Sequence, residues 1–176
     1  MRANISSLRI LAIHPTSRGF GFVVLEGPTS AIDWAVKATR AEKAPRTLTK
    51  VRELLKHYRP ELLVVEDGRR SRHCRRILCL VDRICSVAKK GGVRTRRLSS
   101  RHVRKVFRTF GAHTKYQIAH TIAQQLPELA PWLPRFRKPW MSEDYHMPVF
   151  EAAALALTHF YSCPLYRRSS KKHLAQ

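Results

Sequence analysis

The feature that most constrains the fold is a change of apolar period along the chain. Its first part holds short apolar or alternating runs that predict strands at Leu8–Ile13, Gly19–Glu26 and Ser30–Lys37. The turns between these runs are short, which predicts an antiparallel meander. From Pro45 onward, apolar residues recur at the three-to-four spacing of an amphipathic helix. A meander followed by helices and further strands predicts an α/β chain with a mixed sheet.

Helices and strands alternate in the second part. The pattern predicts helix Pro45–Tyr58, strand Glu61–Val65, helix Cys74–Lys90, strand Val93–Leu98, and helices Arg101–Phe107, Thr114–Leu126 and Val149–Tyr161. A connector rich in proline and tryptophan, Pro127–Trp140, precedes the last helix. We expect one domain over residues 1–165, with helices on both faces of the sheet, and a basic tail over 166–176.

Charge limits the partners of the chain. Its 34 Lys and Arg residues face 12 Asp and Glu residues, which gives a formal net charge of +22. This imbalance favours a polyanionic partner, most often nucleic acid, over a small-molecule substrate. No apolar run approaches the roughly 20 residues of a membrane-spanning helix. We therefore expect a protein of the cytoplasm, in the bacterial cytosol or nucleoid, with no membrane partner.

Basic side chains gather in clusters that suit phosphate binding, since guanidinium groups donate forked hydrogen bonds. The candidates for nucleic-acid contact are Arg18, Arg69, Arg70, Arg72, Arg75, Arg76, Arg97, Arg101, Arg104, Lys105, Lys115, Arg135, Arg137 and Lys138. Any one cluster could equally be a solvated face. Trp140 and Phe136, among the basic residues of the connector, could stack on unpaired bases. The alternative for Trp132 and Trp140 is packing beneath the connector.

The scarce acids lie at the ends of predicted elements. Glu66 ends one buried strand, and His14 follows the first strand. If these two strands are parallel neighbours, both side chains lie at the same edge of the sheet. Glu151 opens the last helix, before alanines that allow a close approach to the sheet. Paired divalent ions, held by carboxylates, hydrolyse phosphodiesters. The alternatives are that Asp144 serves the helix N-terminus and that Glu66 pairs with a neighbouring arginine.

These residues resemble the motifs of RuvC-type Holliday-junction resolvases, within the RNase H-like superfamily. Ile10–Gly21 is similar to the first motif, Leu63–Asp67 to the second, Gly111–Lys115 to a glycine-then-lysine segment, and Glu151–His159 to the final helix. The motifs stand in the family's order over residues 8–162. The resemblance implies a five-stranded mixed sheet with helices on both faces, a two-metal site, and nicking of branched DNA.

Carried onto this chain, the resemblance implies a catalytic and metal-binding site. Glu66 and Glu151 match acids of the family, Lys115 would lie near the scissile phosphate, and Asp144 is a candidate for a further ligand. His14 stands where the family has Asp and would complete the metal site. Because a neutral imidazole offers one uncharged nitrogen, a pair of Mg²⁺ ions should bind less well, and Mn²⁺ should tolerate the change better.

Two functions follow as hypotheses. The first is a metal-dependent endonuclease, using Mg²⁺ or Mn²⁺, that nicks branched DNA. The second is a catalytically impaired module of the same fold that binds DNA or structured RNA within a larger assembly. Symmetric cutting of a junction would suit a homodimer. His14 separates the two hypotheses, since it replaces an acid that the chemistry of the family needs.

Overall fold

The computed structural model describes residues 7–38, 43–68, 75–138 and 140–163. Its five-stranded sheet has the order β3-β2-β1-β4-β5. The strands are β1 (Arg9–Thr16), β2 (Gly19–Glu26), β3 (Ala31–Ala38), β4 (Leu62–Glu66) and β5 (Arg94–Leu98). The pairs β1–β2 and β2–β3 are antiparallel, whereas β1–β4 and β4–β5 are parallel. The structure thus confirms the predicted meander and mixed sheet.

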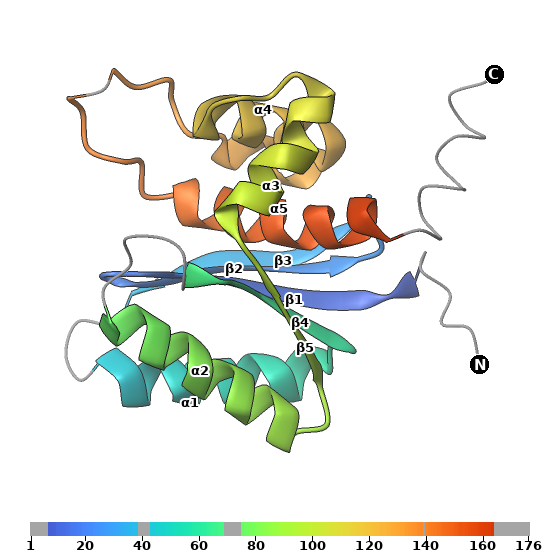
Figure 1. Ribbon diagram of the computed structural model, residues 1–176, viewed down its shortest axis with the longest axis vertical. Coiled ribbons are helices and arrows are strands. Elements are labelled where there is room, and N and C mark those ends of the chain that lie inside the picture. Colours follow the sequence, from blue (N-terminus) through green and yellow to red (C-terminus); the bar gives the residue numbers. More distant parts are fainter. Residues whose placement is uncertain (1–6, 39–42, 69–74, 139, 164–176) are drawn as a thin grey trace.

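Helices cover both faces of this sheet (Figure 1). One face carries α1 (Lys43–Tyr58) and α2 (Arg75–Lys90), and the other carries α3 (Ser100–Phe107), α4 (Lys115–Gln125) and α5 (Met147–Ser162). Short 3₁₀ turns follow α3 and α4, as η3 (Arg108–Phe110) and η4 (Pro127–Trp132). None of the helices in the described ranges is long and apolar enough to cross a membrane.

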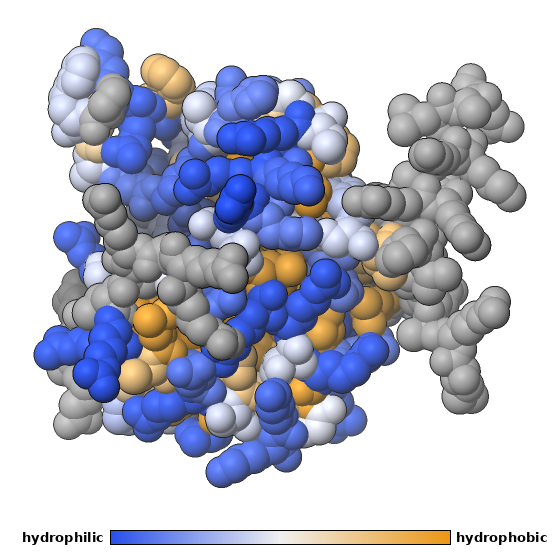
Figure 2. All heavy atoms as spheres, viewed as in Figure 1, coloured by the Kyte–Doolittle hydropathy of each residue, from blue (hydrophilic) through white to orange (hydrophobic). Residues whose placement is uncertain are grey.

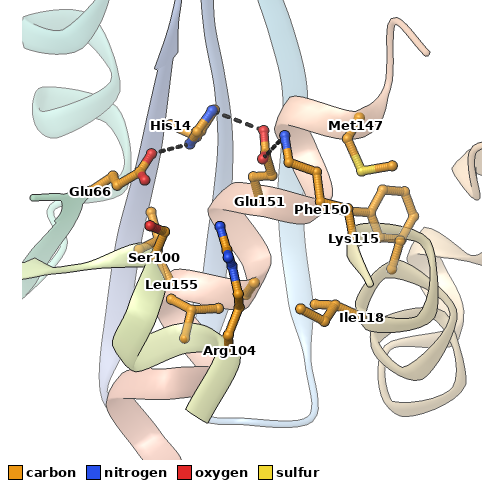
Figure 3. A pocket seen from close by; sticks show the side chains of 13 residues that line it. His14, Glu66, Ser100, Arg104, Lys115, Ile118, Met147, Phe150, Glu151 and Leu155 are labelled. Atoms are coloured by element: carbon orange, nitrogen blue, oxygen red, sulfur yellow. Dashed lines mark ion pairs between the residues drawn. The ribbon is translucent and has the colours of Figure 1, made fainter. Parts of the chain in front are cut away.

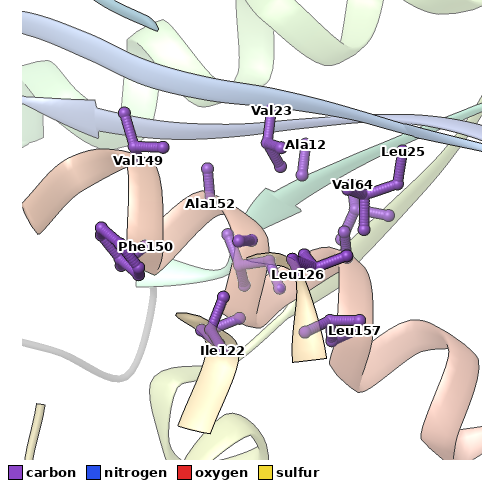
Figure 4. Packing of buried hydrophobic residues seen from close by; sticks show 14 of the residues in the cluster. Ala12, Val23, Leu25, Val64, Ile122, Leu126, Val149, Phe150, Ala152 and Leu157 are labelled. Carbon is purple, nitrogen blue, oxygen red and sulfur yellow. The ribbon is translucent and has the colours of Figure 1, made fainter. Parts of the chain in front are cut away.

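Side chains of the central strands alternate between two apolar cores, as the period of a strand requires. Leu11 and Ile13 point into the core beneath α1 and α2. Ile10 and Ala12 point into the core that α5 closes. Figure 4 shows this second core, where side chains of the sheet meet Ala152 and Val149 of α5.

The close approach of α5 to the sheet depends on small residues. Ala152, Ala153 and Ala156 are fully buried. On the sheet side, a Cβ atom added at Gly21 would lie 2.4 Å from the backbone of Pro148, where α5 begins. Glycine is therefore required at this contact, and it sets the position of the first turn of α5 relative to β1 and β2.

Several predicted boundaries move in the structure. β1 continues through Pro15 to Thr16, because β2 still pairs with it after β4 has separated, and a strand with one neighbour tolerates proline. Trp132 packs edge-on against Trp34, which agrees with the packing alternative, but Trp140 is 78% exposed, so that alternative is wrong for Trp140. Of the free cysteines in the described residues, only Cys85 is buried. The predicted tail, 166–176, lies outside those residues.

Candidate functional site

Strand register brings the first two site residues together. In the parallel pair β1–β4, Ala12 lies opposite Val64, and one further step of two residues along each strand reaches His14 and Glu66. Both side chains therefore stand at the carboxyl end of their strands, on the face that α5 covers. The predicted meeting of these residues at one sheet edge is confirmed.

Glu151 reaches the same edge from α5. His14 pairs across β1–β2 with Gly21, and the backbone of Pro148 packs closely against this glycine. Glu151 lies one turn after Pro148, which places its carboxylate over the end of β1. The local sequence explains this position, since a glycine in β2 and alanines after Glu151 let the helix lie close to the strands.

His14 bridges the two carboxylates (Figure 3). Its Nδ1 atom lies 3.1 Å from Oε2 of Glu66, and its Nε2 atom lies 2.9 Å from Oε2 of Glu151. Lys115, at the start of α4, places Nζ 2.6 Å from Oε1 of Glu151 and 2.8 Å from Oε1 of Glu143. Each oxygen of Glu151 thus has its own cationic partner. The sequence provided no signal for the ion pair between Lys115 and Glu143.

These contacts determine which groups carry charge. Burial opposes the charge of His14, but its hydrogen bonds to Glu151 and Glu66, and the charges of these acids, raise its pKa to about 9. Burial also opposes the charge of Glu151, yet His14 and Lys115 lower its pKa to about 2. At neutral pH, His14 is therefore an imidazolium. The neutral imidazole predicted from the sequence is wrong, because that prediction left out the two acids.

A small pocket opens beside this network, with a volume of about 70 Å³. Its polar rim includes Lys115, Ser100 and Arg104, and its floor is apolar, with Met147 and Phe150 of α5. Figure 3 shows Arg104 reaching toward the carboxylates from α3. The pocket joins the ion-pair network to the exposed basic residues of α3. The sequence predicts Arg104 as a phosphate contact but gives no signal for the apolar residues that line the pocket.

The donor set does not fit a pair of hard divalent ions. Both ring nitrogens of His14 face carboxylates, so an imidazolium has no lone pair to offer a metal. Within the described residues, no group of three or more His, Cys, Asp or Glu is arranged to hold a metal ion. The positive charge that the acids require is supplied by His14 and Lys115.

Asp144 is not brought to the network. Its Oδ1 atom accepts a hydrogen bond of 2.8 Å from the backbone N–H of His146 and lies 3.3 Å from the ring nitrogen Nδ1 of the same residue. Asp144 is absent from the residues that line the pocket. It stabilises the approach to α5, which agrees with the alternative given for it, and its role as a metal ligand remains a prediction.

The predicted nucleic-acid residues divide into exposed and engaged groups. Arg97 donates to Asp82 at 2.7 Å, so part of its charge is used within the fold. The exposed group consists of Arg18, Arg75, Arg76, Arg101, Arg104, Lys105, Arg135, Arg137 and Lys138. Figure 2 shows hydrophilic side chains over α3 and α4, and others spread over the helices on the opposite side of the sheet. Arg69, Arg70 and Arg72 lie outside the described residues.

His159, near the end of α5, has a structural role. Nδ1 of His159 lies 2.8 Å from the guanidinium of Arg96. Burial and the charges of Arg96 and Arg94 lower the pKa of His159 to about 4, so its ring is neutral and accepts this hydrogen bond. The pair joins the end of α5 to the edge strand β5, as expected for a histidine without a catalytic role.

Comparison with known proteins supports the fold. No family model matches the sequence, and no curated protein sequence matches it. Among solved structures, Thermus thermophilus RuvC in complex with Holliday junction substrate matches with a TM-score of 0.66 and 19% identity, over 92% of this chain and 96% of that one. Another Thermus thermophilus RuvC structure matches with a TM-score of 0.66 and 20% identity, over 93% and 97%.

A more distant solved structure agrees with these. The yeast mitochondrial Holliday junction resolvase Ydc2 has a TM-score of 0.56 and 14% identity, over 95% of this chain and 85% of that one. Each match covers more than nine-tenths of this chain. The chain therefore has the fold of RuvC-type Holliday-junction resolvases, as the motifs in its sequence predicted.

Proposed function

We propose that this protein binds branched DNA through the basic face around the pocket, and that its own cations stand where the chemistry of the family needs metal ions. The observation that carries the proposal is the bridging of Glu66 and Glu151 by His14, at 3.1 and 2.9 Å. The imidazolium of His14 offsets one of the two negative charges of Glu66 and Glu151, and Lys115 contacts the second oxygen of Glu151. Arg104, exposed on α3 at the same pocket, is then a candidate for phosphate. The proposed activity is binding without hydrolysis.

Charge and fold support the choice of ligand. A net charge of +22 is far larger than solubility requires, and exposed basic residues of α3 flank the pocket. The structural relatives include a RuvC bound to a Holliday junction. Branched DNA is therefore the first ligand to test, with structured RNA as the comparison. Binding should weaken steeply with salt, because phosphate contacts release counterions.

A second candidate function is nicking of branched DNA, and a specific observation favours it. Glu66, Glu151 and Lys115 converge at one sheet edge beside a pocket, as a phosphodiesterase site would require. His14 argues against this function, because both of its ring nitrogens contact carboxylates. A single substitution at this position therefore separates the two functions.

The deciding experiment compares the wild-type protein with His14→Asp on a synthetic four-way junction, a duplex of the same sequence, and a structured RNA. Each is incubated without metal, with Mg²⁺ and with Mn²⁺, and both binding and cleavage are measured. We expect the wild-type protein to prefer the junction and to cleave nothing. We expect His14→Asp to gain metal-dependent nicking, since it restores a third carboxylate.

The outcomes separate the candidates. Metal-dependent cleavage by the wild-type protein would establish the nuclease and overturn the proposal. Failure of the wild-type protein to bind any nucleic acid at low salt would remove both functions. The variant His14→Asp/Glu151→Gln is the matched control, since it lacks an acid that cleavage would need while keeping the new aspartate. Cleavage by this control would indicate a contaminating nuclease.

A further inference from the structure

The connector that leads into α5 exposes aromatic rings, although rings of this size normally lie in a core. Phe136 is 72% exposed and Trp140 is 78% exposed, the highest values among the exposed large hydrophobic side chains of the described residues. In Figure 1 the connector projects from the body of the molecule, between α4 and α5. In Figure 2 this projection carries hydrophobic and hydrophilic side chains side by side. Such exposure requires an explanation.

The rings are held in place by neighbours. Phe136 meets Tyr116 of α4 edge-on, with ring centroids 5.3 Å apart and planes at 83°. The Nζ atom of Lys138 lies 5.4 Å from the centre of the Trp140 ring. The backbone N–H of Met141 donates to the carbonyl oxygen of Lys138 at 3.0 Å, which closes a turn. The connector thus presents two positioned rings with open surface.

The positive charge of the connector favours a nucleic-acid strand as its partner. Arg135, Arg137 and Lys138 are exposed beside the two rings. Glu143, three residues after the end of the connector, is paired with Lys115. Alternating aromatic and basic side chains suit a nucleic-acid strand, since rings stack on bases while cations meet phosphates. An apolar protein partner would not need this positive charge.

We propose that Phe136 and Trp140 form a stacking site for unpaired bases of a single strand, separate from the ion-pair network at the sheet edge. This inference rests on the proposed function. The two rings would bind the unpaired bases of a branched ligand, which arginines that contact duplex phosphates do not recognise. Lys115 lies between the two places, since it contacts Glu143, just after the connector, and Glu151 of the network. A strand that leaves a branch at the pocket would meet the connector next.

The experiment compares an oligothymidylate with an abasic oligomer of the same length, which keeps every phosphate but offers no base. The wild-type protein should bind the intact oligomer at least about tenfold more tightly. The double variant Phe136→Ala/Trp140→Ala should bind both oligomers equally, at the wild-type affinity for the abasic one. Ile32→Ala, which removes an exposed apolar side chain from β3, is the matched control and should keep the preference.

A spectroscopic readout follows the ring directly. Binding of the intact oligomer should quench tryptophan emission, and Trp140→Phe should lose most of this quenching while retaining the preference for bases, because phenylalanine still stacks. Circular dichroism of each variant confirms that it is folded, which is expected for substitutions at exposed sites.

Each contrary result has a distinct meaning. Equal affinity of the wild-type protein for intact and abasic oligomers would overturn the stacking site and leave the proposed function intact. Loss of all binding at low salt would overturn the proposed function and this inference together. If bases do not matter but the double variant abolishes self-association of the wild-type protein, the connector is a contact with a second copy, which also overturns stacking.

Discussion

The Nε2 atom of His14 lies 2.9 Å from one oxygen of Glu151, while Lys115 occupies the other oxygen of the same carboxylate at 2.6 Å. Glu66 holds the remaining ring nitrogen of His14. The network therefore alternates acids and cations drawn from distant parts of the chain. Removal of its most buried cation, His14, would leave two partly buried carboxylates without their shared partner.

Replacing His14 by aspartate should destabilise the protein and make its stability depend on divalent cations. Three carboxylates would then face one another, and we expect a loss of about 3 kcal/mol in the free energy of unfolding. Mn²⁺ or Mg²⁺ should restore part of this loss, because each binds the folded state. Thermal denaturation with and without metal measures both effects. The same substitution at exposed His113 is the control, and an equal response there would contradict the prediction.

Stability should depend on pH through the network. Because the folded pKa of His14, about 9, exceeds its usual 6.5, its contribution is complete below about 6.5 and is lost as pH rises through 9. The folded pKa of Glu151, about 2, lies below its usual 4.5, so its contribution is complete above 4.5 and is lost as pH falls through 2. The network therefore contributes most between about 4.5 and 6.5.

The variant His14→Gln isolates this dependence. Glu66 and Glu151 face His14 directly, while Lys115 and Arg104 border the same pocket. Unfolding by urea, repeated across pH, should show that the variant lacks the decline between about 6.5 and 9 that the wild-type protein has. Parallel curves for the two proteins in that range would show that His14 does not carry the charge.

Replacing Lys115 by methionine should change the titration of Glu151 more than the stability of the protein. Lys115 is 56% exposed, so its ion pairs should contribute less than about 1 kcal/mol. The pKa of Glu151 should rise but stay below its ordinary value, since His14 remains. Titration of the carboxyl carbons by NMR measures this shift. Lys105→Met, on α3, is the control and should leave Glu151 unchanged.

Gly21→Ala tests the contact that positions α5. The new methyl group would lie 2.4 Å from the backbone of Pro148, so the helix must move or the strand must bend. We expect a destabilisation of about 3 kcal/mol, and weaker junction binding, because a shift of α5 moves Met147 and Phe150, which line the pocket beside the proposed binding face. Gly91→Ala is the control, since its Cβ would meet the nearest atom at 3.4 Å. Equal stability of the two variants would contradict this role of Gly21.

Arg104→Gln tests the proposed phosphate contact at the rim of the pocket. We expect weaker binding to junction and duplex alike, and a decrease of about one in the salt dependence of the binding constant. Fluorescence anisotropy at several salt concentrations measures both quantities. Arg52→Gln removes an equal charge from α1, on the opposite face of the sheet, and should change binding much less (Figure 1). Equal effects of the two substitutions would indicate charge alone rather than this contact.

Local patterns in the sequence determined most of the architecture. The apolar period separated strands from helices, because a strand repeats every two residues and a helix every 3.6. The same reasoning placed His14 and Glu66 at one sheet edge, since parallel strands end together. It missed the extension of β1 through Pro15, because the end of that strand depends on its partner β2. It left open whether Trp140 packs or is exposed, because packing depends on neighbours distant in sequence.

Only the tertiary structure decided the chemistry of the site. The protonation of His14 depends on two acids, 52 and 137 residues further along the chain, which lie within 3.1 and 2.9 Å of its ring. Electrostatic energies change steeply over such distances and with burial, and no local pattern reports either quantity. The sequence by itself therefore determined which elements form and which residues share an edge, whereas the folded contacts decided that the acids are neutralised by the protein's own cations.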